Sequence, residues 1–360
     1  LKSVALMETP WVRQAKRESE ARRNVGILFD DNRLNDEKRR TFEKLKQMQL
    51  SDGAWPWFPG GRGNDYITLY ITTGFGRLGH LGVDIDPSLA IKSLNRLDNW
   101  INKTYRDILK HGKKENNHLS STIALYLYGR SFFLEQQKIN PNAREAVDYF
   151  LGQARKYWLE LGNRQSQGHV ALALHRFGKD KDTPKAIVRS LKERSVSDDE
   201  MGMFWRDEEL SWWWHRAPIE TQAVMIEVFD EIMNDQKSVE ECKVWLLKQK
   251  QTQDWKTTKA TADAVYALVL RGSDLLASDE LVKVSLADMA PIKPENVEAG
   301  TGYYEKRFVG SEIKPDFGKV TVTKVDKGVA WGSVHWQYME DISKITRHES
   351  TPLKIKKTLY

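Results

Sequence analysis

The residues best placed to do acid–base chemistry lie in a tryptophan-rich segment. Residues 212–214 are three consecutive tryptophans that precede His215 and Arg216, and Trp205 lies shortly before them. A histidine among large aromatic side chains can act as an acid, a base or a hydrogen-bond donor in the wall of a pocket. The same segment can instead form a buried aromatic plug with a hydrogen-bonded histidine. The sequence favours the plug, because no partner base or nucleophile is identifiable beside His215.

A nucleophilic cysteine is not predicted. Cys242 is the only cysteine, which excludes an intramolecular disulfide and a cysteine-based zinc cluster. It shares a predicted helical face with Trp245 and Leu246, and its neighbours Glu240 and Glu241 disfavour the thiolate. We therefore predict a core cysteine. The eight histidines include no His-Glu-x-x-His pattern, so we expect no metal site, and no cofactor is indicated.

Residues 74–79 match the Gly-x-Gly-x-x-Gly pattern of dinucleotide-binding loops, and Asp98 follows at a suitable distance. That fingerprint requires a helix to begin at the glycines and to present its N-terminus to the pyrophosphate. Gly82 and Pro87 leave no room for such a helix. The pattern therefore indicates small residues at a crowded helix end.

Two other classes of enzyme are built on helical rings. A terpene cyclase needs an Asp-x-Asp-Asp acid, and the Asp-Ile-Asp-Pro sequence at 84–87 falls short of it. A polysaccharide lyase uses Tyr/His/Arg clefts, and this alternative stays open through His215 and Arg216. No residue is assigned a catalytic role.

The element around which the chain is organised is the loop at 49–61. Asp52-Gly53 signals a turn, two prolines forbid a helix, and Trp55, Trp57 and Phe58 fall within four positions. Aromatic side chains at this density are expected to be buried. The sequence Gln-Thr-Gln-Asp-Trp at 251–255 is a weaker repeat of this loop. Each of the two loops lies between predicted helices, so we expect their tryptophans to point inward and to close the ends of helix pairs. The candidate cavity or plug residues are Trp55, Trp57, Phe58, Trp205, Trp212, Trp213, Trp214, His215 and Trp255, and the loop-forming residues are Asp52, Gly53, Gly60 and Gly61.

Apolar stripes at helical spacing recur along the chain to about residue 270 and include no convincing strand. Helix openings repeat at intervals of roughly 40–55 residues, which is typical of stacked helix pairs. The predicted fold is all-α, an α/α toroid over 1–288, because the aromatic loops need a shared interior. A Pro- and Gly-containing linker at 289–302 precedes a small all-β segment at 303–360. Strands are expected at 319–325 and 329–338, joined by a turn at 326–328.

The charge and hydropathy of the chain argue against a nucleic-acid-binding protein and against a membrane-spanning one. The 360 residues carry a formal net charge of +6 with both signs interleaved, which is typical of a solvated surface and not of a nucleic-acid footprint. No run approaches the length of a membrane span. The chain begins without an initiator methionine or a signal peptide and ends in a strand-like sequence, so we expect a fragment of a longer protein.

Taken together, these segments resemble bacterial α2-macroglobulins, especially those of Bacteroidetes type. The resemblance runs over nearly the whole chain. It rests on Glu-Thr-Pro-Trp-Val at 8–12, the loop at 52–61 followed by Tyr-Ile-Thr at 66–68, residues 212–221, Trp-Leu-Leu-Lys-Gln-Lys at 245–250 with 258–268, and Trp-Gly-Ser-Val-His-Trp at 331–336. The aromatic loops alone are not specific, but their combination with the last segment is.

The resemblance implies a thioester-domain toroid followed by part of a β-domain. Members of that family trap endopeptidases: a protease cuts a bait region, and an exposed Cys–Gln thioester reacts with its lysines. The required Cys-x-Glu-Gln sequence is absent, since Cys242 is followed at the third position by Trp245. No thioester residue is therefore assigned.

The function implied is a non-enzymatic part of an envelope or periplasmic inhibitor from a Gram-negative bacterium. In the parent protein the helical ring would shelter a thioester from water. Its partners would be the remaining domains and the target proteases. The alternative is a carbohydrate- or lipid-active toroid enzyme, a lyase or cyclase, that uses the aromatic cavity directly.

Overall fold

The computed structural model describes residues 31–199, 201–206, 218–252, 255, 257–270, 281–295, 297, 304–325, 334–337 and 341. These residues form two compact units, each described by itself. The helical unit comprises the described residues up to 279 together with those of 293–308, and the β unit comprises those of 280–292 and those from 309 onward. The domain limits expected from the sequence stay a prediction. Among the described residues, no helix has the length and apolar character needed to cross a bilayer.

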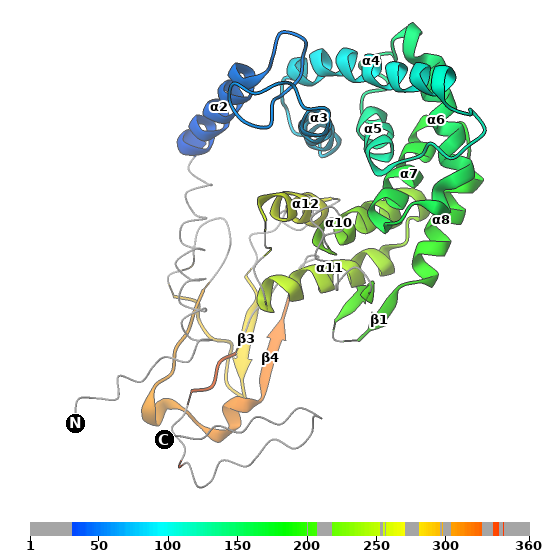
Figure 1. Ribbon diagram of the computed structural model, residues 1–360. Coiled ribbons are helices and arrows are strands. Elements are labelled where there is room, and N and C mark those ends of the chain that lie inside the picture. Colours follow the sequence, from blue (N-terminus) through cyan, green and yellow to red (C-terminus); the bar gives the residue numbers. More distant parts are fainter. Residues whose placement is uncertain are drawn as a thin grey trace, which may run out of the picture. The chain divides into compact units, whose positions relative to one another are not determined.

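The described chain is mostly helical, and its helices alternate between two layers (Figure 1). The buried layer consists of helices that pack side by side in chain order, and the outer layer covers them. The buried layer contains α3 (Asp65–His80), α5 (Ser121–Ser131), α7 (Arg164–Phe177), α10 (Pro218–Val228) and α12 (Thr258–Val269). The outer layer contains α4 (Ser88–His111), α6 (Arg144–Tyr157), α8 (Asp182–Glu193) and α11 (Gln236–Thr252), and α2 (Asp31–Met48) packs beside α3.

Local sequence sets where the buried-layer helices begin and end. Asn64, Ser120 and Asn163 each accept a hydrogen bond from a backbone N–H in the first turn, which is the preferred N-cap arrangement. Gly178 ends α7 in the left-handed conformation at φ 68°. The central helices α7 and α10 are buried on all sides over most of their length, whereas α4 and α8 bury one face. This difference in burial defines the two layers.

Close approach between buried-layer helices depends on a missing side chain at Gly168. A Cβ on Gly168 of α7 would lie 2.6 Å from Val224 and 2.9 Å from Met225 of α10. Only glycine allows α7 and α10 to pack at this distance without a shift of the neighbouring side chains.

Strands occur in the helical unit, contrary to the sequence prediction. β1 (Val196–Asp198) and β2 (Gly202–Phe204) form an antiparallel hairpin. Gly202 adopts φ 76°, and a Cβ there would lie 2.1 Å from the carbonyl oxygen of Glu241 in α11. The prediction failed because strands of three residues are too short to show an alternating pattern.

The β unit contains a two-stranded antiparallel sheet of β3 (Lys283–Leu286) and β4 (Val320–Thr323), with Val284 opposite Val322. The strand predicted at 319–325 is thus confirmed over β4, but its partner β3 lies within the range predicted as helical. Of the second predicted strand at 329–338, residues 334–337 are described and are not in a strand, and the rest lies outside the described residues. Short 3₁₀ turns at Gly310–Glu312 and Pro315–Gly318 complete the unit.

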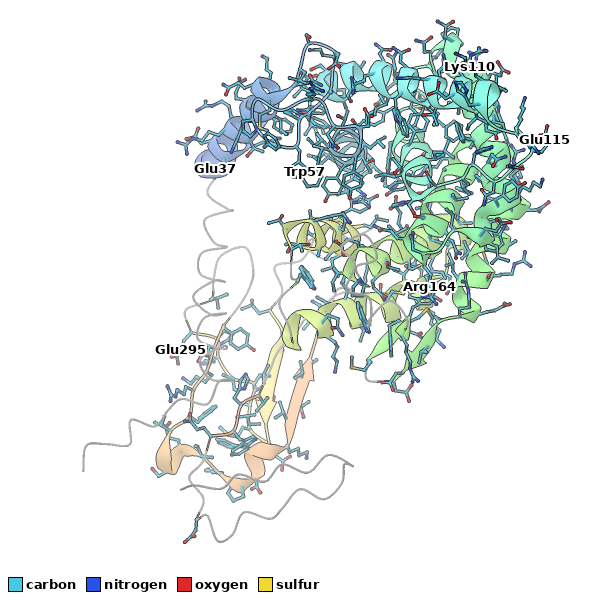
Figure 2. All side chains as sticks on the ribbon, viewed as in Figure 1. Glu37, Trp57, Lys110, Glu115, Arg164 and Glu295 are labelled. Carbon is cyan, nitrogen blue, oxygen red and sulfur yellow. The ribbon has the colours of Figure 1, made fainter. Side chains whose placement is uncertain are left out.

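The loop between α2 and α3, on which Figure 2 labels Trp57, buries another of its aromatic residues, Trp55. Trp55 is fully buried, its indole N–H donates to the carbonyl oxygen of Leu45 at 2.9 Å, and its backbone N–H donates to Thr68 Oγ1 at 3.0 Å. Trp57 and Phe58 are 61% and 63% exposed. The expectation that the whole loop is buried is therefore wrong for these two residues, because they lie at the tip of the loop, beyond the β-bridge between Pro56 and Gly63.

Replacing Trp55 by alanine should lower the free energy of unfolding by about 3–5 kcal/mol, because it removes a fully buried indole and leaves a cavity. Chemical denaturation of the two proteins measures the difference. Trp57→Ala on the same loop is the control and should change stability by less than about 0.5 kcal/mol, because its side chain is exposed. Equal effects of the two substitutions would contradict the anchoring role of Trp55.

Candidate functional site

The aromatic residues predicted to line a cavity or form a plug do not lie together where the structure describes them. Trp205 belongs to the main hydrophobic cluster, where it stacks on Phe229 and donates to the carbonyl oxygen of Leu191. Trp255 packs half-buried against the same cluster, whereas Trp55 belongs to a separate, smaller cluster. Trp212, Trp213, Trp214 and His215 lie outside the described residues, so their pocket or plug role stays a prediction.

Cys242 lies on α11 as a fully buried side chain between the buried residues Trp245 and Val239. Burial raises the pKa of its thiol well above the ordinary value, and the nearby carboxylates of Glu241 and Asp235 raise it further. The thiol therefore stays protonated and has no access to a substrate.

Iodoacetamide should leave Cys242 unlabelled in the folded chain at neutral pH and should label it in denaturant. Intact-mass spectrometry distinguishes the two states. The expected result follows from burial and the raised pKa of the thiol. Rapid labelling of the folded chain would contradict this assignment.

The Gly-x-Gly-x-x-Gly residues lie inside α3 and approach its C-terminal end, where no helix N-terminus is available for a pyrophosphate. Gly76 packs against Phe132, the residue that follows α5. Asp98, which would bind the ribose in a dinucleotide site, forms a buried ion pair with Arg130 and accepts a hydrogen bond from Tyr126. The pattern therefore reflects helix packing.

Sequence reasoning missed a buried polar cluster where α3, α5, α7, α10 and α12 meet. The signal was present, because these helices carry single charged residues within otherwise apolar or small-residue stretches. The cluster consists of Arg77, Tyr128, His169, Arg176, Glu227, Asp263 and Tyr266, all buried or nearly so. Charged groups at such positions require partners inside the protein.

Arg77 of α3 is one centre of the cluster. Its Nη1 donates to Asp263 Oδ1 of α12 at 2.5 Å, and its Nε donates to the hydroxyl oxygen of Tyr128 at 3.1 Å. Its guanidinium also lies 4.8 Å from the ring centre of Tyr266. One side chain of α3 is thus bonded to α5 and to α12.

Glu227 of α10 is the second centre. Its two carboxylate oxygens accept hydrogen bonds from the hydroxyls of Tyr128 and Tyr266 at 2.5 and 3.0 Å. Arg176 of α7 donates to Glu227 at 2.6 Å and also to both oxygens of Glu231 in the π-helical turn Phe229–Met233. Every carboxylate oxygen of this pair therefore has a donor.

The environment fixes the charge of each group in the cluster. Burial acts to raise the pKa of Glu227, but Arg176 and Arg77 outweigh it and hold the pKa below its usual range. Burial raises the pKa of Tyr128 and Tyr266, which stay neutral donors. Burial, together with the nearby cations, lowers the pKa of His169, whose neutral ring stacks 4.6 Å from that of Tyr128. The charged residues of the cluster therefore form a paired ionic network.

A metal ion was considered at His80, Glu227 and Glu231, whose ligand atoms lie within 4.8 Å of one another. The Arg176 guanidinium already bonds to both carboxylates, and a bound cation would have to displace it. These residues therefore do not fit a metal site.

Glu220 and Lys259 form a second polar pair beside the cluster. Lys259 Nζ of α12 lies 3.3 Å from Glu220 Oε1 of α10, whereas Glu220 Oε2 is buried without a hydrogen-bond partner. Burial raises the pKa of Glu220, and Lys259 offsets part of this effect. The ionised carboxylate is therefore held at a cost in free energy near neutral pH.

Glu220→Gln should raise the free energy of unfolding at pH 7 by about 1 kcal/mol, because it removes a partly unpaired buried charge. The partner Lys259 has a side chain that is 22% exposed, so it keeps its hydration when the carboxylate is removed, unlike a fully buried cation. When the folded-state pKa of a carboxyl is raised, the folded protein becomes more stable as the pH falls through that pKa. The difference between variant and wild type should therefore shrink as the pH falls and vanish below about pH 3, where Glu220 is protonated in both folded and unfolded chains. Denaturation curves at several pH values measure it, with the exposed Glu135→Gln as control. A variant less stable at pH 7 would contradict the prediction.

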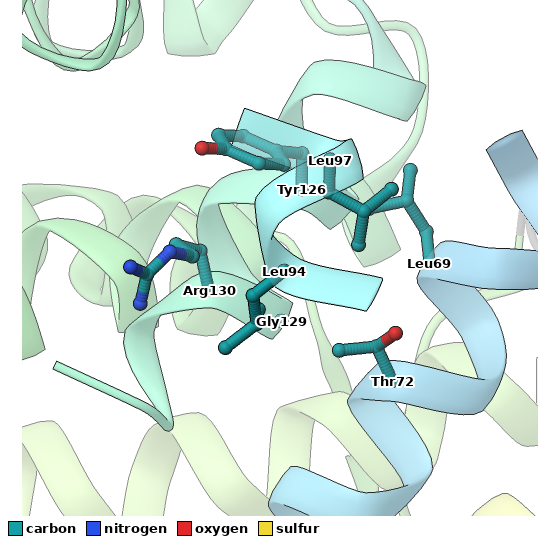
Figure 3. Close-up of a pocket in the computed structure, with 7 residues that line it drawn as sticks. All are labelled: Leu69, Thr72, Leu94, Leu97, Tyr126, Gly129 and Arg130. Carbon is teal, nitrogen blue, oxygen red and sulfur yellow. The ribbon is translucent and has the colours of Figure 1, made fainter. Parts of the chain in front are cut away.

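One space among the described helices lies close to the cluster. A space between α3, α4 and α5 is lined by Leu69, Thr72, Leu94, Leu97, Tyr126, Gly129 and Arg130 (Figure 3). It is too small to admit a water molecule. This space is therefore a packing defect and does not hold a ligand.

Comparison with known proteins gives structural similarity alone. No protein-family model matches the chain, and no curated protein matches it. Similar solved structures are bacterial α2-macroglobulins. Escherichia coli α2-macroglobulin activated by porcine elastase has a TM-score of 0.44 and 18% identity, over 70% of this chain and 21% of that chain. Salmonella α2-macroglobulin reacted with methylamine has a TM-score of 0.45 and 19% identity, over 71% and 16% of the two chains.

A third structure, native E. coli α2-macroglobulin from domain MG7 to the C-terminus, has a TM-score of 0.44 and 19% identity. The similarity extends over 71% of this chain and 37% of that structure's chain. The chain thus spans well under half of each of these proteins. Identities and TM-scores at this level assign no activity or site residue to it.

Proposed function

We propose that the helical unit is a non-catalytic scaffold, a toroid of helix pairs in a macroglobulin-type endopeptidase inhibitor. The observation that carries the proposal is the state of the buried polar cluster. Arg77, Arg176, Glu227 and Asp263 converge where the buried-layer helices meet, but they neutralise one another. A hydrolytic or cyclising site needs a free acid or base in contact with a substrate cavity.

Closure of the helices into a toroid is part of the proposal. It is supported by side-chain contacts between α3 and α12, the first and last helices of the buried layer. Arg77 pairs with Asp263, and Lys259 lies 5.9 Å from the ring centre of Tyr70. Contacts of this kind are expected when a row of helix pairs returns on itself.

The inhibitor role rests on the segments that resemble bacterial macroglobulins, above all the loop at 52–61 and the sequence at 331–336. In this proposal the longer protein is exported to the periplasm or cell envelope, and its other domains and target proteases are the partners of this chain. The helical unit would support a thioester supplied outside this sequence, because Cys242 is buried and lacks the required glutamine.

The test compares two substrates of one endopeptidase. The longest natural protein that contains this chain is mixed with the protease, and cleavage of a large protein and of a small chromogenic peptide is measured. Trapping should suppress cleavage of the large substrate and spare that of the small one, because only the former is excluded from an enclosed protease. The 360-residue chain alone is the control and should suppress neither.

Undiminished cleavage of both substrates would reject the inhibitor role. The alternative function, a carbohydrate- or lipid-active enzyme, is tested on the 360-residue chain alone, with an acidic polysaccharide and an isoprenoid diphosphate as substrates. Formation of an unsaturated sugar or a cyclised hydrocarbon would reject the scaffold and favour the enzyme.

A further inference from the structure

The joints between neighbouring helices of the buried layer are of two kinds. Successive helices from α3 to α12 pack with their backbones close together. Gly129 of α5 lies against Thr73 of α3, and Gly168 of α7 lies against Val224 of α10. α12 buries Ala264 and other small residues. Burial of apolar surface holds these joints together and contributes roughly 25 cal/mol for each Å² removed from water.

The joint between α3 and α12 is different, because it lacks the extensive backbone packing of the other joints and is bridged mainly by long polar side chains. Arg77 of α3 reaches Asp263 and the ring of Tyr266 on α12. Lys259 of α12 reaches Tyr70 of α3. A buried ion pair stabilises little relative to apolar packing, since the desolvation of both charges offsets their attraction. This joint therefore resists separation less than the others do.

Buried atoms beside this joint also lack partners. Glu220 Oε2 and His169 Nδ1 are buried without a hydrogen bond. Glu220 is itself bonded to Lys259 of α12, and the charges of Arg77 and Lys259 both act on the His169 ring. Each unpaired atom costs free energy in the closed state and would regain water if the joint opened. The cost of opening is therefore lowered at this place in the fold.

We propose that the α3–α12 joint is a polar latch that opens locally while the rest of the helical unit stays folded. Opening separates Arg77 from Asp263 and lets water reach Glu220 and the half-buried faces of Tyr66 and Tyr70. Local openings of this kind have free energies below that of global unfolding. The latch is a property of the helical unit and does not rest on the inhibitor role.

The experiment is hydrogen exchange of the 360-residue chain, followed by mass spectrometry under conditions where exchange reports the opening equilibrium. Asp263→Asn removes the counter-charge of Arg77. It should speed exchange in α12 and in the C-terminal half of α3 by about tenfold to a hundredfold, because a buried charge loses its partner. Exchange in α5 and α7 should be unchanged.

Asp98→Asn is the matched control. Asp98 of α4 is buried with Arg130 of α5, as Asp263 is with Arg77, but its pair lies away from the joint. It should speed exchange in α4 and α5 and leave α12 as in the wild type. Equal acceleration in all five buried-layer helices by Asp263→Asn, or no change in α12, would overturn the latch.

If Asp263→Asn does not fold, a double substitution tests the proposed opening between α3 and α12. Arg77→Met combined with Asp263→Leu replaces the ion pair by apolar contact. A latch made of charges predicts slower exchange in α12 than in the wild type. Exchange in α12 that is equal to or faster than the wild-type rate would overturn the proposal.

Discussion

Neutralisation of buried charge is the constraint on which the centre of the helical unit depends. Arg77 and Arg176 are surrounded by apolar helices, and an unpaired charge there would be strongly unfavourable. Each therefore has carboxylate partners on other helices, Asp263 for Arg77 and Glu227 with Glu231 for Arg176. The tyrosine hydroxyls that bond to Glu227 complete the network. The positions of five helices are coupled through these side chains.

The same pairing limits what the cluster can do. A catalytic carboxylate is held near its substrate with its proton affinity adjusted to neutral pH. In this network the Glu227 pKa is held low by arginines, and the tyrosines and His169 stay neutral. A network of this type orients helices and resists substitution of single members. This pairing is the basis on which we propose a scaffold for the helical unit.

The aromatic loop shows a similar division of roles within a few residues. Trp55 ties α2 to α3 through its buried indole, while Trp57 and Phe58 face outward from the same turn. Gly53 makes the turn possible, since at φ 88° a Cβ would come within 2.6 Å of the carbonyl oxygen of Lys92. Side chains adjacent in sequence thus meet opposite environments, which composition alone does not reveal.

The sequence by itself determined the helical class, the strand at 320–323 and the burial of Cys242, because periodicity and neighbouring charges are local properties. Only the tertiary structure decided that β4 pairs with β3, that Trp57 and Phe58 are exposed, and that Arg77 meets Asp263, 186 residues away. Single charged residues in apolar helices show that partners must exist. Which residues those are depends on how helices distant in sequence are brought together, and no local pattern records that.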